Sequence, residues 1–419
     1  MIRFFNSKVP NTNDSDFQDF GKSKPEALKQ IGRCNILVIG NTGVGKSTLI
    51  GTVLQTPVGT SRTEEISKRP YSHSVAPIAL YDTPGLEKEN KQRKQVKNLI
   101  KKFVNEQKKK EPNEHIHVVW YCLNSQTTRE SDIDQKWISS LAKELPVILV
   151  ITRAYKSGKT EFQSRLQTHL EVRHVIPILA EAEDTNKGTV EPHGLDTLKS
   201  KTEELLDEVA QKAISDKVDC LAKKAFIQCL DTCGKLLGFQ FVPISLIKSP
   251  GVSLLQNWMV NDISKTFGYN FNQDFVKKVC SIGVLCGYDS FIEEALKSLP
   301  INQDNIQSIQ DVLQNLTTIV SETAVSIPFK DEFLDLINSL ANSSLGNVPV
   351  IAGITAIATI FSTWVLGCAL IEALKVYKSA DYKNEELPDL EALLMDNIQA
   401  IIQFIQQSLG TTVNPSFAS

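Results

Sequence analysis

The residues with the clearest chemical capacity form one glycine-rich stretch, GNTGVGKS, at 40–47. Its spacing is G-x-x-x-x-G-K-[ST]. It stands between a short run of apolar, β-branched residues and a segment with helical spacing, which is the context that this motif requires. The glycines let the backbone turn and approach an anion without Cβ clashes. Because successive amides at a helix N-terminus form an anion-binding nest, the sequence predicts a loop that holds phosphates.

The side chains and amides of this loop have separate expected tasks. Lys46 is expected to place a cation beside the β- and γ-phosphates of a nucleotide. The Ser47 hydroxyl is expected to ligate Mg²⁺, a hard cation that prefers oxygen ligands. The residues expected to bind the phosphates are Asn41, Thr42, Gly43, Val44, Gly45, Lys46, Ser47 and Thr48.

A second motif, DTPG, ends the next long apolar run and supports the same chemistry. Its first residue, Asp82, is expected to hold Mg²⁺ through a water, and the amide of Gly85 is expected to bond the γ-phosphate. The loop between the motifs needs a Thr whose hydroxyl reaches the metal. Thr63 is the predicted residue, with Thr60 as the alternative. The predicted catalytic set is therefore Lys46, Thr63 and Gly85.

The base-reading motif departs from the expected pattern. After the run PVILV one expects Thr/Asn-Lys-x-Asp, whose carboxylate accepts hydrogen bonds from guanine N1 and N2. The chain instead reads Thr152, Arg153, Ala154 and Tyr155, so a phenol replaces the carboxylate. Thr152 and Arg153 are still expected to contact the nucleotide, with Arg153 covering the base face, and the amide of Ala180 is expected to contact the base oxygen. Guanine and adenine both stay open, and ATP use is an alternative.

The residue that orients the attacking water also differs from the common pattern. In Ras-type proteins a Gln follows the glycine of the second motif, whereas this chain has Leu86. No arginine that would complete the transition-state contacts is identifiable from the sequence. We therefore expect slow intrinsic hydrolysis that is helped by a dimer, a partner or another group of the chain. A nearly inactive nucleotide-binding scaffold is the alternative.

An alternation of apolar runs and helical patterns is expected to position these motifs. This order predicts a parallel sheet that is covered by helices on both faces. We therefore expect an α/β P-loop domain over 30–212, preceded by a polar tail over 1–29. Long helical patterns dominate afterwards, so 213–419 is predicted to be an all-α domain. The expected strands lie in the runs 34–40, 75–85, 115–123, 146–152 and 174–180.

Charge is divided unevenly along the 419 residues. The net charge of −3 argues against a generally basic nucleic-acid binder. Residues 1–200 hold 30 Lys and Arg against 23 Asp and Glu, whereas 201–419 hold 15 against 25. Ten of the cations fall within 88–110, which we interpret as a solvated helix face, with contact to a polyanion or anionic lipid as the alternative. Eight cysteines without a C-x-x-C pair favour a reducing cytosol.

One uncharged stretch leaves the location of the chain open. Residues 338–371 carry no charged side chain, and 348–371 would form a helix of about 36 Å, longer than a hydrocarbon core of about 30 Å. The stretch is either a buried helix of the all-α domain or a segment that inserts into or contacts a membrane. The expected localisation is therefore cytoplasmic, with peripheral or integral membrane association left open.

The segments GNTGVGKST, TEEI, DTPGL and VVWYCLN resemble the Era-like group of the translation-factor-related P-loop GTPases. More narrowly, the chain is similar to GTPases in which an Era-like domain precedes an uncharacterised helical domain, with the resemblance covering 30–210. It implies GTP and GDP as ligands with Mg²⁺, and a helical domain that is often membrane-associated. The expected partners are a membrane or protein effector through 213–419 and, because catalytic groups are missing, a nucleotide-dependent second copy. No sequence feature points to a specific nucleic acid.

Overall fold

The computed structural model describes residues 17–56, 66–67, 69–86, 90–126, 135–156, 160–186, 188–239, 250–285 and 350–409, with individual residues between 313 and 338. Its internal contacts divide the chain into two compact units, Met1–Lys217 and Val218–Ser419. The division falls inside helix α7 (Leu206–Phe239), slightly beyond the domain boundary that the sequence suggested at 212.

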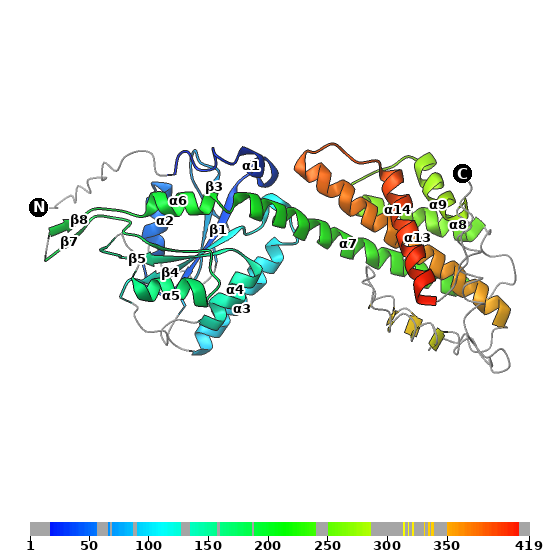
Figure 1. Ribbon diagram of the computed structural model, residues 1–419, viewed down its shortest axis with the longest axis horizontal. Coiled ribbons are helices and arrows are strands. Elements are labelled where there is room, and N and C mark those ends of the chain that lie inside the picture. The colour runs from blue at the N-terminus through cyan, green and yellow to red at the C-terminus, as the bar shows by residue number, and fades with distance from the viewer. Residues whose placement is uncertain are drawn as a thin grey trace, which may run out of the picture. The chain divides into compact units, whose positions relative to one another are not determined.

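The N-terminal unit is built on a six-stranded sheet with the order β2-β3-β1-β4-β5-β6 (Figure 1). Short β2 runs antiparallel to β3 at one edge, and the remaining neighbours pair in parallel. The predicted parallel-rich α/β fold is therefore confirmed. The strands are β1 (Cys34–Gly40), β2 (Tyr71–Ser72), β3 (Ile78–Asp82), β4 (Val118–Asn124), β5 (Val147–Thr152) and β6 (His174–Pro177).

Helices cover both faces of this sheet, which explains why the central strands read as continuous apolar runs. Along β1, Ile36 and Val38 pack into one core and Leu37 and Ile39 into the other, because successive side chains point to opposite faces. The first core is shared with α1 (Pro25–Ile31), α2 (Lys46–Leu54), α6 (Leu195–Glu203) and the start of α7. The second is shared with α3 (Asn90–Gln107), α4 (Gln135–Glu144) and α5 (Glu161–His169).

The segment before β1 differs from the polar tail expected over 1–29. Phe17 and Phe20 are buried, and the ring of Phe17 meets that of Trp120 edge-on at 6.1 Å. Helix α1 adds Ala27 and Ile31 to the same core. The sequence did not predict this burial, because Phe17 and Phe20 are isolated aromatic residues in a polar segment and form no periodic apolar pattern. Residues 17–29 are therefore part of the folded unit.

A buried polar cluster joins the loop before β4 to β1. The backbone N–H of Asn35 donates to Nδ1 of His117 at 2.9 Å, and Nε2 of His117 lies 2.9 Å from the carbonyl oxygen of Pro112. The ring is therefore neutral, with its proton on Nε2. The Asn35 amide donates to the carbonyl oxygens of Asn113 and His115. His115 and His117 thus serve packing and hydrogen bonding in this unit.

The burial of His117 predicts a loss of stability in acid. Burial lowers the pKa of His117 to about 4 from its ordinary value of 6.5. The unfolded chain therefore takes up a proton between pH 6.5 and 4 that the folded chain excludes. The contribution is complete above pH 6.5 and is lost as the pH falls through 4, a total of about 3 kcal/mol. In urea unfolding at pH 7, 5.5 and 4, we expect the advantage of wild type over His117→Gln to shrink by this amount. Parallel pH dependences would contradict the assignment.

The described secondary structure of the C-terminal unit is entirely helical, which confirms the all-α prediction for these residues. The helical pattern also predicts a helix over 304–325, and almost all of that segment lies outside the described residues. The helices that follow the α7 residues of this unit are α8 (Pro250–Thr266), α9 (Gln273–Leu285), α13 (Val350–Lys383) and α14 (Leu390–Leu409) (Figure 1).

Helix α13 forms the centre of the C-terminal unit. Its part Ile357–Lys383 is long and apolar enough to cross a membrane, but 94% of its most apolar window is buried inside the unit. The thiols of Cys229 and Cys233 on α7 approach the carbonyl oxygens of Trp364 and Ile360 at 3.9 and 3.8 Å. These contacts favour the interpretation as a buried core helix.

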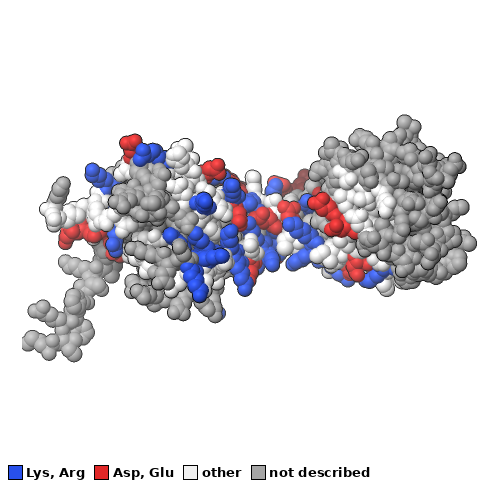
Figure 2. Space-filling model, turned by 90° about the horizontal axis from the view of Figure 1, so that it is seen from below, with Lys and Arg blue, Asp and Glu red and all other residues white. Residues whose placement is uncertain are grey.

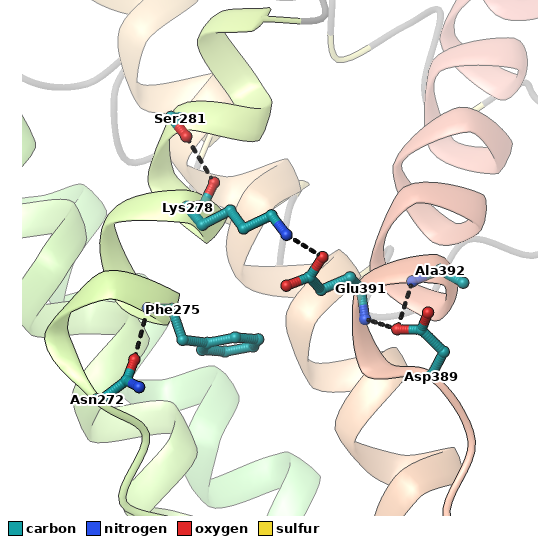
Figure 3. A network of polar contacts seen from close by, with 7 residues as sticks. All are labelled: Asn272, Phe275, Lys278, Ser281, Asp389, Glu391 and Ala392. Atoms are coloured by element: carbon teal, nitrogen blue, oxygen red, sulfur yellow. Dashed lines mark hydrogen bonds and ion pairs between the residues drawn. The ribbon is translucent and has the colours of Figure 1, made fainter.

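Polar contacts fix α9 beside α14 at the surface of this unit (Figure 3). Lys278 on α9 forms an ion pair with Glu391 in the first turn of α14. Each helix begins at a capping side chain, since the N–H of Phe275 donates to Oδ1 of Asn272 at 2.8 Å and the N–H of Glu391 donates to Oδ1 of Asp389 at 2.9 Å. Such caps replace the hydrogen bonds that the first helical turn lacks.

The basic run predicted from the sequence lies mainly on α3. Figure 2 shows Lys and Arg side chains gathered on the lower side of the N-terminal unit, where α3 lies in Figure 1. Part of this charge has neighbours within the unit: Lys97 and Lys101 each lie 5.6 Å from the ring centre of Trp137, and Lys108 lies 3.6 Å from Glu144. These neighbours suit a solvated helix face, and contact with a polyanion stays a prediction.

Candidate nucleotide-binding site

The glycine-rich loop connects the carboxyl end of β1 to the start of α2, at the position where the sheet order changes direction. Gly43 and Gly45 have φ values of 77° and 98°, in the left-handed region that side chains disfavour. Gly45 precedes α2, and no side chain among the described residues caps the helix there. A helix N-terminus without a side-chain cap is suited to bind an anion.

The second motif packs directly against this loop. A Cβ atom placed on Gly85 would lie 2.1 Å from Oγ1 and 2.9 Å from the backbone nitrogen of Thr42. The N–H of Leu86 donates to the carbonyl oxygen of Gly40 at 3.1 Å. The absence of a side chain at Gly85 thus permits the contact between the two motifs.

Lys46 and Asp82 are both buried between these motifs. Nζ of Lys46 donates to the carbonyl oxygens of Gly40 at 3.1 Å and Asn41 at 3.3 Å. Burial raises the pKa of Asp82, while the nearby Lys46 cation lowers it. Oδ1 of Asp82 is buried and has no hydrogen-bond partner among the described residues. A buried carboxylate oxygen in this position fits the hydrated Mg²⁺ that the P-loop chemistry implies, with Ser47 supplying the neighbouring hydroxyl ligand.

Thr63 and Thr60 lie outside the described residues. The nearest described residues after them are Ile66, which is buried, and Ser67. The N–H of Ser67 donates to the carbonyl oxygen of Asp82, and Oγ of Ser67 accepts from the N–H of Asp82, both at 3.2 Å. The chain four residues beyond Thr63 therefore lies at the end of β3.

The predicted base-binding residues line one pocket of about 210 Å³. The pocket extends from the start of α2 to the ends of β5 and β6. Thr152 is buried at the end of β5, where its hydroxyl donates to the carbonyl oxygen of Val44 at 2.5 Å. The lining residues are Gly45, Thr48, Leu49, Thr152, Arg153, Ile178, Leu179, Ala180, Glu181, Ala182 and Glu183.

Arg153 and Tyr155 occupy the two positions at which the base-reading motif differs from the expected Lys and Asp. Arg153 is exposed and has a φ of 52°, which is uncommon for a residue with a side chain. Tyr155 is 41% exposed, and its hydroxyl donates to Oε1 of Glu183 at 3.0 Å. Glu183 belongs to a hairpin that sequence reasoning missed, formed by β7 (Glu183–Thr185) and β8 (Gly188–Val190). Glu183 joins the site by lining the pocket and by its contact with Tyr155, neither of which has a signal in the sequence.

The catalytic side of the site contains one further residue that sequence reasoning missed. Leu86 is buried in the second core, so its side chain cannot hold an attacking water. Arg93 on α3 places Nη2 3.5 Å from Oδ1 of Asn41 in the glycine-rich loop. The signal that the sequence offered for Arg93 was its position on the helix that follows the DTPG motif.

Comparison with known proteins agrees with the geometry of the N-terminal unit. Residues 35–153 match the family described as 50S ribosome-binding GTPase. The neuronal-specific septin-3 of Danio rerio is 29% identical over 168 residues, which cover 33% of this chain and 46% of that protein. The septin-3 of Rattus norvegicus is 28% identical over 171 residues, covering 34% and 48%. The chain thus spans about half the length of the curated relatives it matches.

Several solved structures match part of the chain. A probable GTP-binding protein EngB is 19% identical and covers 42% of this chain and 100% of its own, with a TM-score of 0.32. Toc33 from Arabidopsis thaliana in complex with Mg²⁺ and GMPPNP is 18% identical and covers 46% and 96%, with a TM-score of 0.32. Era from Aquifex aeolicus bound to GDP and AlF4⁻ is 24% identical and covers 41% and 56%, with a TM-score of 0.27.

The phosphate loop, the sheet order and the match over 35–153 show that the N-terminal unit has the fold of a G domain and resembles P-loop GTPases. The family match ends at residue 153 and includes no part of the C-terminal unit.

Proposed function

We propose that the N-terminal unit binds GTP and GDP with Mg²⁺ and hydrolyses GTP slowly as a conformational switch. The observation that supports this most directly is the buried pair of Lys46 and Asp82 at the mouth of an uncapped helix, with a pocket leading from the loop to the predicted base-binding residues. Membership of the Era-like group is part of this proposal and rests on the motifs.

The chain's own groups suffice for a binding role. Lys46, which now donates to two loop carbonyls, can redirect its ammonium group to the β- and γ-phosphates, while the loop amides bind the remaining oxygens. Ser47 and, through water, Asp82 would hold Mg²⁺, together with Thr63. When bound, Mg²⁺ neutralises phosphate charge during hydrolysis. Because Leu86 cannot orient the water, the intrinsic rate is expected to be low.

The switching role follows from the contacts between the two motifs. Gly85 contacts Thr42, and Ser67 is hydrogen-bonded to Asp82. A γ-phosphate bound at the loop would therefore lie beside both the DTPG motif and the segment that precedes Ser67. Its loss would release the Gly85 amide and Thr63 together, which is the common mechanism of GTPase switches. Residues 193–213, through α6 and the start of α7, are the proposed connection to the C-terminal unit. A membrane or protein effector and a second copy of the chain are the proposed partners.

Calorimetry with GTP, GDP and ATP, each with and without Mg²⁺, tests this function. We expect GTP and GDP to bind at least about tenfold more tightly than ATP, and EDTA to weaken GTP binding by about tenfold or more. Tighter binding of ATP would support the ATP-using alternative. Binding without any phosphate release would support the scaffold alternative, and absence of binding would contradict the proposal.

A further inference from the structure

The structure contains a carboxylate at the base end of the pocket, although the usual Asp is replaced by Tyr155. Glu183 lines the pocket together with Arg153 and Ala180, and its Oε1 accepts from the Tyr155 hydroxyl at 3.0 Å. We propose that Glu183, held by Tyr155, is the residue that recognises the guanine base. This inference rests on the proposed nucleotide-binding function and specifies its ligand.

Both members of this pair stand on fixed backbone. The backbone of Ala154, the residue before Tyr155, makes two polar contacts. The N–H of Ala154 donates to the carbonyl oxygen of Ile178 at 2.9 Å, and the carbonyl oxygen of Ala154 lies 2.7 Å from Nε2 of His193. Glu183 is held by the β7–β8 hairpin, in which it pairs with Val190.

The base of the hairpin is closed by reciprocal hydrogen bonds. The N–H of Leu179 donates to the carbonyl oxygen of His193, and the N–H of His193 donates to the carbonyl oxygen of Leu179, both at 3.0 Å. His193 therefore joins the hairpin to the end of β5 on one side and to the end of β6 on the other. The hydroxyl of Tyr155 and the carboxylate of Glu183 are thus positioned by backbone contacts on both sides.

The chemistry of the bases explains why this carboxylate would select guanine. Guanine presents two donors side by side, N1–H and the 2-amino group, and a carboxylate can accept from both. Adenine presents an acceptor at N1, which faces the carboxylate unfavourably. The Tyr155 hydroxyl occupies one lone pair of Oε1 and leaves acceptor capacity for the base on both oxygens. Selection would then depend on a residue 28 positions after the usual one.

Glu181 is the competing carboxylate, because it lines the same pocket. Glu181 is exposed, whereas Glu183 is half-buried and bonded to Tyr155. A group that is held in place loses less freedom on binding, so Glu183 is favoured. The two residues provide a matched pair of test positions.

The replacement Glu183→Gln tests the proposal through xanthine nucleotides, which carry an oxygen in place of the 2-amino group of guanine. The Gln carbonyl oxygen can still accept from N1–H, but its NH2 group donates to that oxygen of xanthine and cannot accept from the 2-amino group of guanine. By calorimetry with GTP and XTP, we expect the GTP affinity to fall about 10²-fold and the preference to invert in favour of XTP. Glu181→Gln should keep the wild-type preference. Tyr155→Phe should weaken GTP binding about threefold to tenfold without a gain for XTP, because Tyr155 only positions Glu183.

Three outcomes would overturn the inference. An unchanged preference for GTP in Glu183→Gln, or an inversion in Glu181→Gln instead, would overturn it while leaving the proposed function intact. A wild-type chain that binds neither GTP nor GDP would overturn both. Binding of inorganic triphosphate, which engages only the phosphate loop, checks that Glu183→Gln retains a folded site. If Glu183→Gln loses triphosphate binding too, circular dichroism separates unfolding of the variant from a direct effect on binding. The inference is then tested with Glu183→Asp. This variant has a shorter side chain but keeps the carboxylate, so it must retain the preference for GTP.

Discussion

Replacement of Lys46 with Ala is expected to lower kcat/KM for GTP hydrolysis by about 10² to 10³-fold, the range for removing one fixed electrostatic group from a transition state. The ammonium group is buried beside Asp82 and the loop carbonyls, where a lost cation is poorly replaced by water. Phosphate release under single-turnover conditions, with Mg²⁺ and with the protein in excess over GTP at subsaturating concentrations, measures the effect.

The control for this variant is Lys143→Ala. Lys143 is an exposed residue in the last turn of α4 and has no part in the site, so its loss should leave the rate unchanged. Phosphate release that is equal in wild type and Lys46→Ala would show that the turnover belongs to another site or to a contaminant. It would then favour the scaffold alternative.

The replacement Gly367→Ala is expected to destabilise the C-terminal unit by about 2 kcal/mol, because overpacking outweighs the gain in helix propensity. A Cβ atom at Gly367 on α13 would lie 2.3 Å from Sγ of Cys229 and 3.3 Å from Sδ of Met259. Cys229 is completely buried and has no room to retreat. Urea unfolding of the full chain measures the change. If α13 instead faced lipid, the added methyl group would cost little.

Two further variants sharpen this test. Gly234→Ala on α7 is the matched control, since nothing lies within 4 Å of the added methyl group, and it should stabilise the chain by up to about 1 kcal/mol. Cys229→Ala removes the clashing sulfur, so the double variant with Gly367→Ala should be more stable than the sum of the single effects by about 1 kcal/mol or more. Strict additivity would show that α7 and α13 do not meet at this point.

The parts of the fold that sequence reasoning predicted are those encoded by local patterns. The phosphate loop and DTPG have fixed spacing, and the buried parallel strands read as apolar runs because both faces are covered. The roles assigned to Thr63, Thr152 and Arg153 stay predictions, and Thr63 lies outside the described residues.

The parts that sequence reasoning missed depend on contacts between distant positions. Phe17 and Phe20 stand alone in a polar segment, and only Trp120 across the core explains their burial. The carboxylate of Glu183 reaches the base pocket through a short hairpin whose strands carry little apolar signal. For α13, composition is the same whether the surrounding medium is protein or lipid, so only packing distinguishes the two.

The thiols of this chain also carry information about motion. Cys34 and Cys122 are buried in the sheet, and Cys229, Cys233 and Cys368 are buried in the helical unit. Burial raises the pKa of Cys122 to about 12, so the reactive thiolate is scarce until the surrounding structure opens. The rate at which each thiol is alkylated under native conditions therefore measures the free energy of local opening at that place. One labelling experiment, analysed cysteine by cysteine, would follow the opening of each unit separately and show which of them responds to nucleotide.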